Sequence, residues 1–121
     1  MATLVIADDD PLVLATTKLL CEHVFGHRVA AVSRASEILG SLRSERPDLL
    51  LQDAKMPGLA LGNLLDSIRA DPEFNSLPIV LFTGTGLLRE RDVPQADAVI
   101  RKPFQPAALG GLIERLTCRE R

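Results

Sequence analysis

Short runs of apolar residues alternate along the chain with stretches in which apolar residues recur at helical spacing. The short runs have the length of buried strands and lie at 3–7, 28–32, 49–52, 79–83 and 98–101. Between them, apolar residues at i, i+3, i+4 and i+7 predict amphipathic helices over 35–45, 61–71 and 106–118. The pattern therefore predicts strands and helices in alternation.

One further helix is predicted from its ends. Asp10 is a suitable N-cap and Pro11 suits the first helical position, so a helix is expected over 11–24, before Gly26. The segment 84–97 has a weaker pattern, because glycines precede its helix-like part and Pro94 follows it. We expect a short or irregular fourth helix there.

This alternation predicts an α/β fold with a parallel sheet covered by helices on both faces. Right-handed crossovers leave few topologies, and a flavodoxin-like, doubly wound sheet of five strands in the order 2-1-3-4-5 suits this length. The chain, 1–121, is expected to form a single domain. In this order the first and third strands are neighbours where the order reverses, and ligands bind at such points.

The composition is that of an ordinary globular domain, with 46% hydrophobic and 25% charged residues. The formal net charge is −2 and there is no block of Lys or Arg, so direct binding to nucleic acid or to an anionic membrane is not expected. No apolar stretch approaches membrane-spanning length, and the first residues lack the pattern of a signal peptide. We therefore expect a cytoplasmic location.

The cysteines and histidines do not indicate a metal site. Cys21 and Cys118 lack the spacing of a metal-binding set and are expected to be reduced rather than bridged. His23 and His27 are four residues apart, but Gly26 between them is expected to end the helix. Surface positions are therefore favoured for both histidines.

Polar side chains stand at the ends of four predicted strands. Asp8 and Asp9 follow the first strand, Asp53 follows the third, Thr83 ends the fourth and Lys102 follows the fifth. Parallel strands end at the same edge of a sheet, so these side chains are expected to meet. Crowded carboxylates repel one another unless a cation lies among them, and their hard oxygens favour Mg²⁺. The group therefore indicates a phosphoryl-transfer site.

Each of these residues also has an ordinary interpretation. Asp10 is most simply an N-cap, Asp53 an acid in a turn, Thr83 a strand end and Lys102 a solvated charge. The ordinary interpretations do not explain why polar groups end four strands. The Lys102-Pro103 peptide is a candidate for a cis bond, because such bonds occur in tight turns.

Four segments together resemble the receiver domain of bacterial two-component response regulators. They occur in the family's order and the resemblance covers the whole chain, which is more specific than any one motif. The segments are Val5-Ile6-Ala7-Asp8-Asp9-Asp10-Pro11, Asp48-Leu49-Leu50-Leu51-Gln52-Asp53-Ala54-Lys55-Met56-Pro57-Gly58, Pro78-Ile79-Val80-Leu81-Phe82-Thr83-Gly84 and Ile100-Arg101-Lys102-Pro103-Phe104.

The resemblance implies that Asp53 is the phosphoacceptor. Its phosphoryl group would come from a phosphohistidine on a sensor histidine kinase or a histidine phosphotransfer protein. Thr83 and Lys102 would each bond a phosphoryl oxygen. The domain would act as a signalling element of a phosphorelay that promotes only its own phosphorylation and dephosphorylation, not as an enzyme on a metabolite. Its changed surface would act on a downstream protein or output domain that the sequence does not identify.

The resemblance also implies a magnesium site. Asp9 and Asp53 would bind Mg²⁺ directly and Asp8 would act through water. The backbone carbonyl of Lys55 would complete the protein ligands.

The chain departs from the family's pattern in three places. The loop Leu59-Ala60-Leu61-Gly62 is apolar and looks one residue longer than usual, and the interval from Thr83 to Lys102 is short. Val99 stands where Tyr or Phe is common. Because that aromatic ring usually moves in the switch, we expect phosphorylation to act here by ordering the loop at Thr83 and Gly84 to Gly86.

Two other functions stay open. A receiver-shaped interaction module that needs no phosphorylation is kept open by Val99 and by the irregular fourth helix, and failure to bind Mg²⁺ would support it. The start Asp8-Asp9-Asp10-Pro11-Leu12 also resembles the Asp-x-Asp signature of haloacid-dehalogenase-like phosphohydrolases, with Asp8 as nucleophile and Asp10 as acid/base. That family is less favoured because the chain is short and lacks a later acidic strand end for the metal. Phosphate on Asp8 rather than Asp53 would support it.

Overall fold

The computed structural model describes residues 1–84 and 88–118. The strands form a five-stranded parallel sheet in the order β2-β1-β3-β4-β5, as predicted. The strands are β1 (Thr3–Ala7), β2 (Arg28–Val32), β3 (Leu49–Asp53), β4 (Ile79–Thr83) and β5 (Ala98–Arg101). β3 continues one residue beyond its predicted end because Asp53 pairs with Phe82 of β4.

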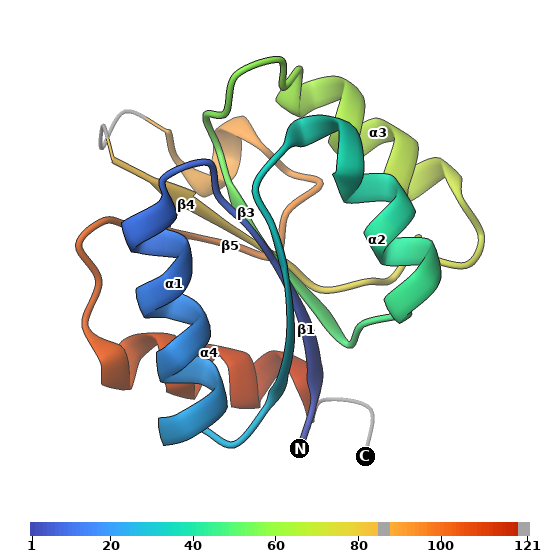
Figure 1. The fold of residues 1–121 in the computed structure, drawn as a ribbon. Helices are drawn as coiled ribbons and strands as arrows, with labels where there is room; N and C mark the ends of the chain where they lie inside the picture. Colours follow the sequence, from blue (N-terminus) through green and yellow to red (C-terminus); the bar gives the residue numbers. More distant parts are fainter. Residues whose placement is uncertain (85–87, 119–121) are drawn as a thin grey trace.

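Helices cover both faces of the sheet (Figure 1). The helices α2 (Ile38–Glu45) and α3 (Leu61–Ala70) lie on one face, and α1 (Pro11–Leu19) and α4 (Pro106–Thr117) lie on the other. Alternate strand residues supply two cores, since Val5 and Leu50 pack toward α2 and α3 whereas Leu4 and Leu51 pack toward α1 and α4. Every residue of β3 and β4 is buried, which holds the ends of these strands in place.

The first helix begins as predicted and ends differently. Asp10 caps α1 by accepting hydrogen bonds from the backbone N–H groups of Leu12 and Val13 at 2.9 and 3.2 Å. The helical path reaches Val24, but its last residues form a π-helix, η1 (Leu20–Val24). A wider turn follows from the bond of the Phe25 N–H to the Leu20 carbonyl, five residues back, at 3.2 Å.

The other differences from the predicted elements are small. The predicted helix at 35–45 opens with a 3-10 turn, η2 (Ala35–Glu37), before α2. Within the described residues between β4 and β5 the only helical segment is the 3-10 helix η3 (Glu90–Asp92), in agreement with a short or irregular fourth helix. Gly86, from the loop predicted to order, and Leu87, from that helix, lie outside the described residues.

The cysteines are both free, Cys21 buried and Cys118 exposed. The Nδ1 atom of His27 accepts a hydrogen bond from the Ala2 N–H at 3.1 Å, and His23 is exposed. None of the helices in the described part of the chain has both the length and the apolar character needed to cross a bilayer.

Candidate functional site

The parallel sheet brings the predicted site residues to one hollow at its carboxyl edge. The strand order makes β1 and β3 neighbours, so the residues after β1 meet the end of β3. The ends of β4 and β5 complete the hollow, because the Lys102 N–H bonds to the Thr83 carbonyl at 2.8 Å. All the predicted site residues line it, namely Asp8, Asp9, Asp53, Lys55, Thr83 and Lys102.

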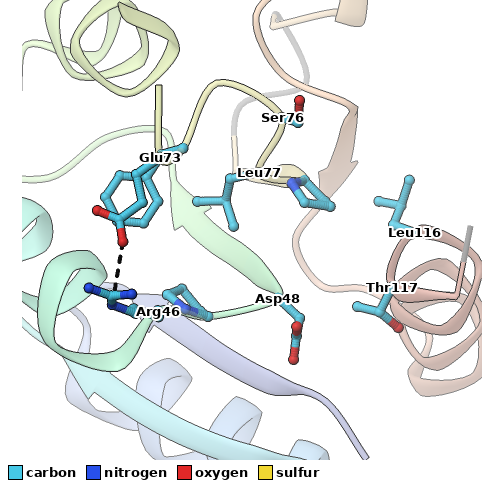
Figure 2. A pocket seen from close by; sticks show the side chains of 10 residues that line it. Arg46, Asp48, Glu73, Ser76, Leu77, Leu116 and Thr117 are labelled. Atoms are coloured by element: carbon cyan, nitrogen blue, oxygen red, sulfur yellow. Dashed lines mark ion pairs between the residues drawn. The ribbon is translucent and has the colours of Figure 1, made fainter. Parts of the chain in front are cut away.

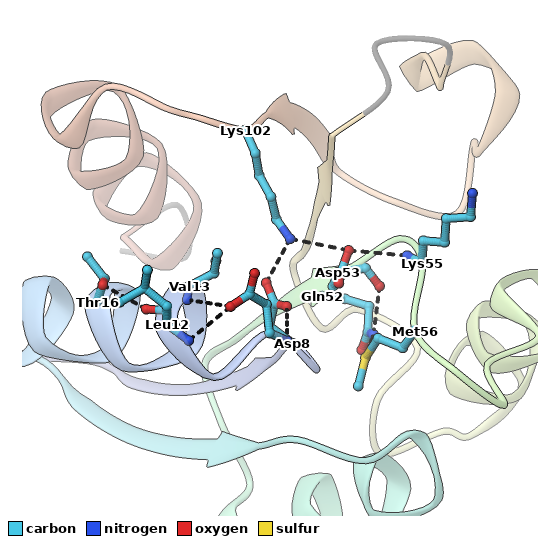
Figure 3. Close-up of polar contacts among 10 residues, drawn as sticks. Asp8, Leu12, Val13, Thr16, Gln52, Asp53, Lys55, Met56 and Lys102 are labelled. Atoms are coloured by element: carbon cyan, nitrogen blue, oxygen red, sulfur yellow. Dashed lines mark hydrogen bonds and ion pairs between the residues drawn. The ribbon is translucent and has the colours of Figure 1, made fainter.

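Lys102 connects two of the carboxylates. Its Nζ lies 2.8 Å from Oδ2 of Asp8 and 3.5 Å from Oδ1 of Asp53 (Figure 3). Asp8 is fully buried, and a buried carboxylate is strongly unfavourable unless it is paired. Burial alone would lower the pKa of Lys102, but its hydrogen bond to Asp8 and the charges of Asp8 and Asp53 outweigh burial and raise that pKa. Lys102 is therefore a fixed cation in the site.

The surroundings of Asp53 oppose the ionisation of its carboxyl group. Burial raises its pKa to about 6, and the neighbouring charge of Asp8 adds to this increase. The hydrogen bond from the Lys55 N–H, at 3.2 Å from Oδ1, and the charge of Lys102 act in the opposite direction without cancelling it. Three carboxyl groups, those of Asp8, Asp9 and Asp53, thus gather near the single ammonium of Lys102 that contacts two of them.

The acid cluster suits a divalent cation. One carboxylate oxygen from each of Asp8, Asp9 and Asp53 can be chosen so that all lie within 4.8 Å of one another. Over residues 1–84 and 88–118 this is the only group of three or more potential metal ligands, and it contains neither His23 nor His27. Hard oxygens with surplus negative charge fit Mg²⁺. The predicted acid cluster is therefore present.

Lys55 and Thr83 contribute different groups to the hollow. The Lys55 backbone reaches Asp53, whereas its side chain extends away from Asp53 and is exposed (Figure 3). Thr83 is 4% exposed at the end of β4 and lines the hollow. The Lys102-Pro103 peptide after β5 is cis, as the sequence suggested.

Two aromatic residues support Lys102 and were not predicted. The rings of Phe82 and Phe104 stack with centroids 5.3 Å apart, and Lys102 Nζ lies 5.9 Å from the centre of the Phe82 ring. The stack places apolar surface beside the lysine and restricts where its ammonium can lie. Phe82 directly precedes Thr83 and Phe104 lies two residues after Lys102, and this proximity to site residues was the signal in the sequence that could have identified them.

A second hollow lies at the opposite edge of the sheet and contains none of the predicted site residues. Figure 2 shows Arg46 and Glu73 on its wall, joined by an ion pair of 3.3 Å. Asp48, Leu116 and Thr117 also line this hollow. The side chains of Arg46 and Glu73 are exposed or half-exposed, so their ion pair contributes little to stability.

Comparison with known proteins supports the sequence resemblance. The family model of the response regulator receiver domain matches residues 4–114. Response regulator Rre1 of Synechocystis is 29% identical over 121 residues, which cover 98% of this chain and 52% of Rre1. The chain thus spans about half the length of this relative.

Solved structures agree with the fold. A protein assigned as a response regulator from Chloroflexus aurantiacus superimposes with a TM-score of 0.88 at 27% identity, covering 98% of each chain. The receiver domain of the sensor histidine kinase PA1611 from Pseudomonas aeruginosa gives a TM-score of 0.85 at 24% identity, covering 96% of this chain and 97% of that one. A magnesium ion is coordinated in the active site cleft of the PA1611 domain.

Proposed function

This chain belongs to the response regulator receiver domain family, a family of signalling domains, and from that premise we propose that it accepts a phosphoryl group on Asp53. The observation that carries the proposal is the placement of the Asp53 carboxylate beside both the Lys102 ammonium and the carboxylates of Asp8 and Asp9. The donor is proposed to be a phosphohistidine on a sensor histidine kinase or a histidine phosphotransfer protein. The protein or output domain that binds the changed surface is the proposed downstream partner.

The proposed transfer is an in-line displacement. An oxygen of the ionised Asp53 forms the new P–O bond while the P–N bond of the donor breaks, and the electron pair of that bond stays on the imidazole nitrogen. Lys102, held 2.8 Å from Asp8, supplies a fixed positive charge to a phosphoryl oxygen. The hydroxyl of Thr83, from the end of β4, is proposed to donate a hydrogen bond to another phosphoryl oxygen.

The donor set fits Mg²⁺, which completes the proposal. Asp9 and Asp53 would bind the ion directly, Asp8 through water, and the Lys55 carbonyl would be the remaining protein ligand. When bound, Mg²⁺ would neutralise charge on the phosphoryl oxygens. The ion in the PA1611 domain is in keeping with this assignment. Autophosphorylation and autodephosphorylation are the only catalytic activities proposed.

The same proposal treats residues 1–121 as one receiver domain acting in the cytoplasm, where a kinase has access to ATP. The hydrolase alternative is not supported by the position of Asp10, whose carboxylate caps α1 through the N–H groups of Leu12 and Val13. An acid/base role would compete with that cap. The phosphorylation-independent module is disfavoured by the assembled acid cluster.

The test is the intact mass of the wild type and of Asp53→Asn after incubation with Mg²⁺ and acetyl phosphate, followed by peptide mapping. One phosphoryl group is expected on the wild type, on Asp53, and none on the variant or after chelation of Mg²⁺. Failure of beryllofluoride to shift the spectra, together with no adduct under any condition, would support the interaction module. An adduct on Asp8 would support the hydrolase.

A further inference from the structure

Gln52 is a fully buried amide directly before the proposed phosphoacceptor. It lies in register between Ala7 of β1 and Leu81 of β4. Paired residues of parallel strands point to the same face of the sheet, so Gln52 points toward α2 and α3, where Ala7 and Leu81 belong to the apolar core. A polar side chain in this position needs an explanation.

The amide of Gln52 holds both ends of the turn that follows β3. Its Nε2 donates to the backbone carbonyl of Asp53 at 2.9 Å and to Sδ of Met56 at 3.3 Å (Figure 3). Its Oε1 finds no hydrogen-bond partner among the residues that the structure describes. An unsatisfied buried oxygen costs stability and offsets part of what the two Nε2 hydrogen bonds contribute, so the net stability gained from this amide is small. Stability alone therefore does not account for this glutamine.

The turn that Gln52 holds carries part of the site. The Lys55 N–H bonds to Oδ1 of Asp53 at 3.2 Å, and the Lys55 carbonyl is a proposed magnesium ligand. Both groups lie between the two points that the Gln52 amide fixes. Small displacements of such groups have large effects on metal binding and phosphoryl transfer.

We propose that Gln52 is a positioning residue for phosphoryl acceptance, which acts by holding the turn from Asp53 to Met56 in its reactive shape. The inference rests on the proposed function of Asp53. It explains why an amide replaces an apolar side chain at this point of β3. Gln52 does not contact the phosphoryl group in this role.

Gln52→Met tests the proposal, because methionine has a similar unbranched shape without the N–H donors. We expect the Mg²⁺ affinity and the rate of phosphorylation by acetyl phosphate each to fall about tenfold. The unfolding temperature is expected to stay close to that of the wild type, because the loss of the Nε2 bonds and the removal of the unsatisfied oxygen offset each other, and the Lys55 amide resonance is expected to move. Gln95→Met is the matched control, because the Gln95 amide donates to Asp66 at 2.8 Å outside the hollow. This control should change neither the Mg²⁺ affinity nor the rate of phosphorylation.

Wild-type Mg²⁺ affinity and phosphorylation rate in Gln52→Met would overturn the positioning role while leaving the function of Asp53 in place. The positioning role would also be overturned if Mg²⁺ affinity and phosphorylation rate fell only as far as a lower unfolding temperature of the variant explains. Gln52→Leu would repeat the comparison with a side chain of a second shape. A wild type that binds Mg²⁺ but takes no phosphate would overturn the proposed function, and the Mg²⁺ affinity of Gln52→Met would then decide the role of Gln52. A wild type that binds no Mg²⁺ would overturn both.

Discussion

Asp53 has a carboxylate whose ionisation opposes folding in the absence of a cation. Its pKa rises from the ordinary 3.8 to about 6 because it is buried and lies near Asp8. The folded protein therefore binds this proton more tightly than the unfolded chain does. The wild type loses stability from this group as the pH rises from about 4 to about 6, and the full cost is present above that window.

Asp53→Asn is therefore expected to stabilise the apo protein at neutral pH. The neutral amide has a similar shape and removes the cost of ionisation, so its advantage in unfolding temperature should grow from pH 4 to pH 6 and then level off. Thermal unfolding in a chelator at a series of pH values measures this. Addition of Mg²⁺ should stabilise the wild type more than the variant. An advantage that is the same at every pH would contradict the argument.

Lys102→Met is expected to separate metal affinity from stability. Removal of an ammonium 2.8 Å from Asp8 leaves a fully buried carboxylate without its charged partner, so the apo protein should lose about 3 kcal/mol of unfolding free energy. The more negative site should bind Mg²⁺ about tenfold more tightly. Urea unfolding and Mg²⁺ titration measure the two effects. Weaker Mg²⁺ binding in a folded variant would contradict the electrostatic argument.

The sequence predicted which residues meet, but not how each is held. Asp8, Asp53, Thr83 and Lys102 could be placed because each stands at the end of an apolar run, and the topology brings such ends together. The closer pairing of Lys102 with Asp8 than with Asp53 depends on the rotamer of a long side chain. The two hydrogen bonds of Gln52 depend on the shape of the following turn. Neither leaves a periodic signal in the chain.

Arg69 of α3 connects three parts of the structure. Its guanidinium donates to the carbonyl of Leu77 at 2.8 Å, in the segment before β4, and to that of Gln95 at 2.7 Å, before β5. It also pairs with Asp97 at 3.2 Å, whose carboxylate accepts from the Ile79 N–H. These bonds fix the beginnings of β4 and β5 relative to α3.

Arg69→Met is expected to lower the unfolding free energy by about 2–4 kcal/mol, because it removes several hydrogen bonds to carbonyls and the partner of a half-buried carboxylate. Hydrogen exchange should become faster in the segments 74–77 and 94–97. Arg43→Met, on an exposed arginine in the last turn of α2, is the control and should change stability little. Equal effects of the two substitutions would show that the bonds of Arg69 are not important for stability.

Two adjacent glycines of α4 offer a matched test of packing. A Cβ on Gly110 would lie 2.6 Å from the Phe25 ring, whereas a Cβ on Gly111 would meet open space. Gly111→Ala should therefore stabilise the protein by about 0.5–1 kcal/mol through helix propensity. Gly110→Ala should be about 1–2 kcal/mol less stable than Gly111→Ala, because the ring must move. Equal stabilities in urea unfolding would mean that Phe25 moves without cost.

The boundaries of helices could be predicted where the sequence has strong start signals or a clear apolar period. Asp10 and Pro11 begin α1 as expected, and the apolar period of 61–71 gives α3. The π-helical end at Leu20–Val24 could not be predicted, because helical and π-helical turns bury similar residues and differ by one hydrogen-bond register. The contact between Phe25 and Gly110 joins elements far apart in the chain and has no local signal.

At the scale of the whole molecule, the parallel strand order determines where the site lies and which segment connects it to the surface. The sheet is buried on both faces, so the ends of β1 and β3 are held rigidly by two cores. Beyond Thr83, Val93 packs in the apolar core and the Arg69 bonds hold the chain at Gln95 and Asp97. A change at Thr83 is therefore expected to act mainly on the residues between Thr83 and these contacts.

If phosphorylation acts by ordering the loop after Thr83, beryllofluoride with Mg²⁺ should shift amide resonances over 83–100. The shifts should be smallest near Gln95 and Asp97, which the Arg69 bonds hold in place. Thr83→Ala should reduce the shifts, because the hydroxyl that connects the loop to the phosphoryl group is lost, and Asp53→Asn should abolish them. Val99 packs against the apolar core beside α2 and α3 and has no ring to rotate, which is why loop ordering is the mechanism proposed for this chain. Spectra of the free and beryllofluoride-bound forms that superimpose over 83–100 would exclude this mechanism.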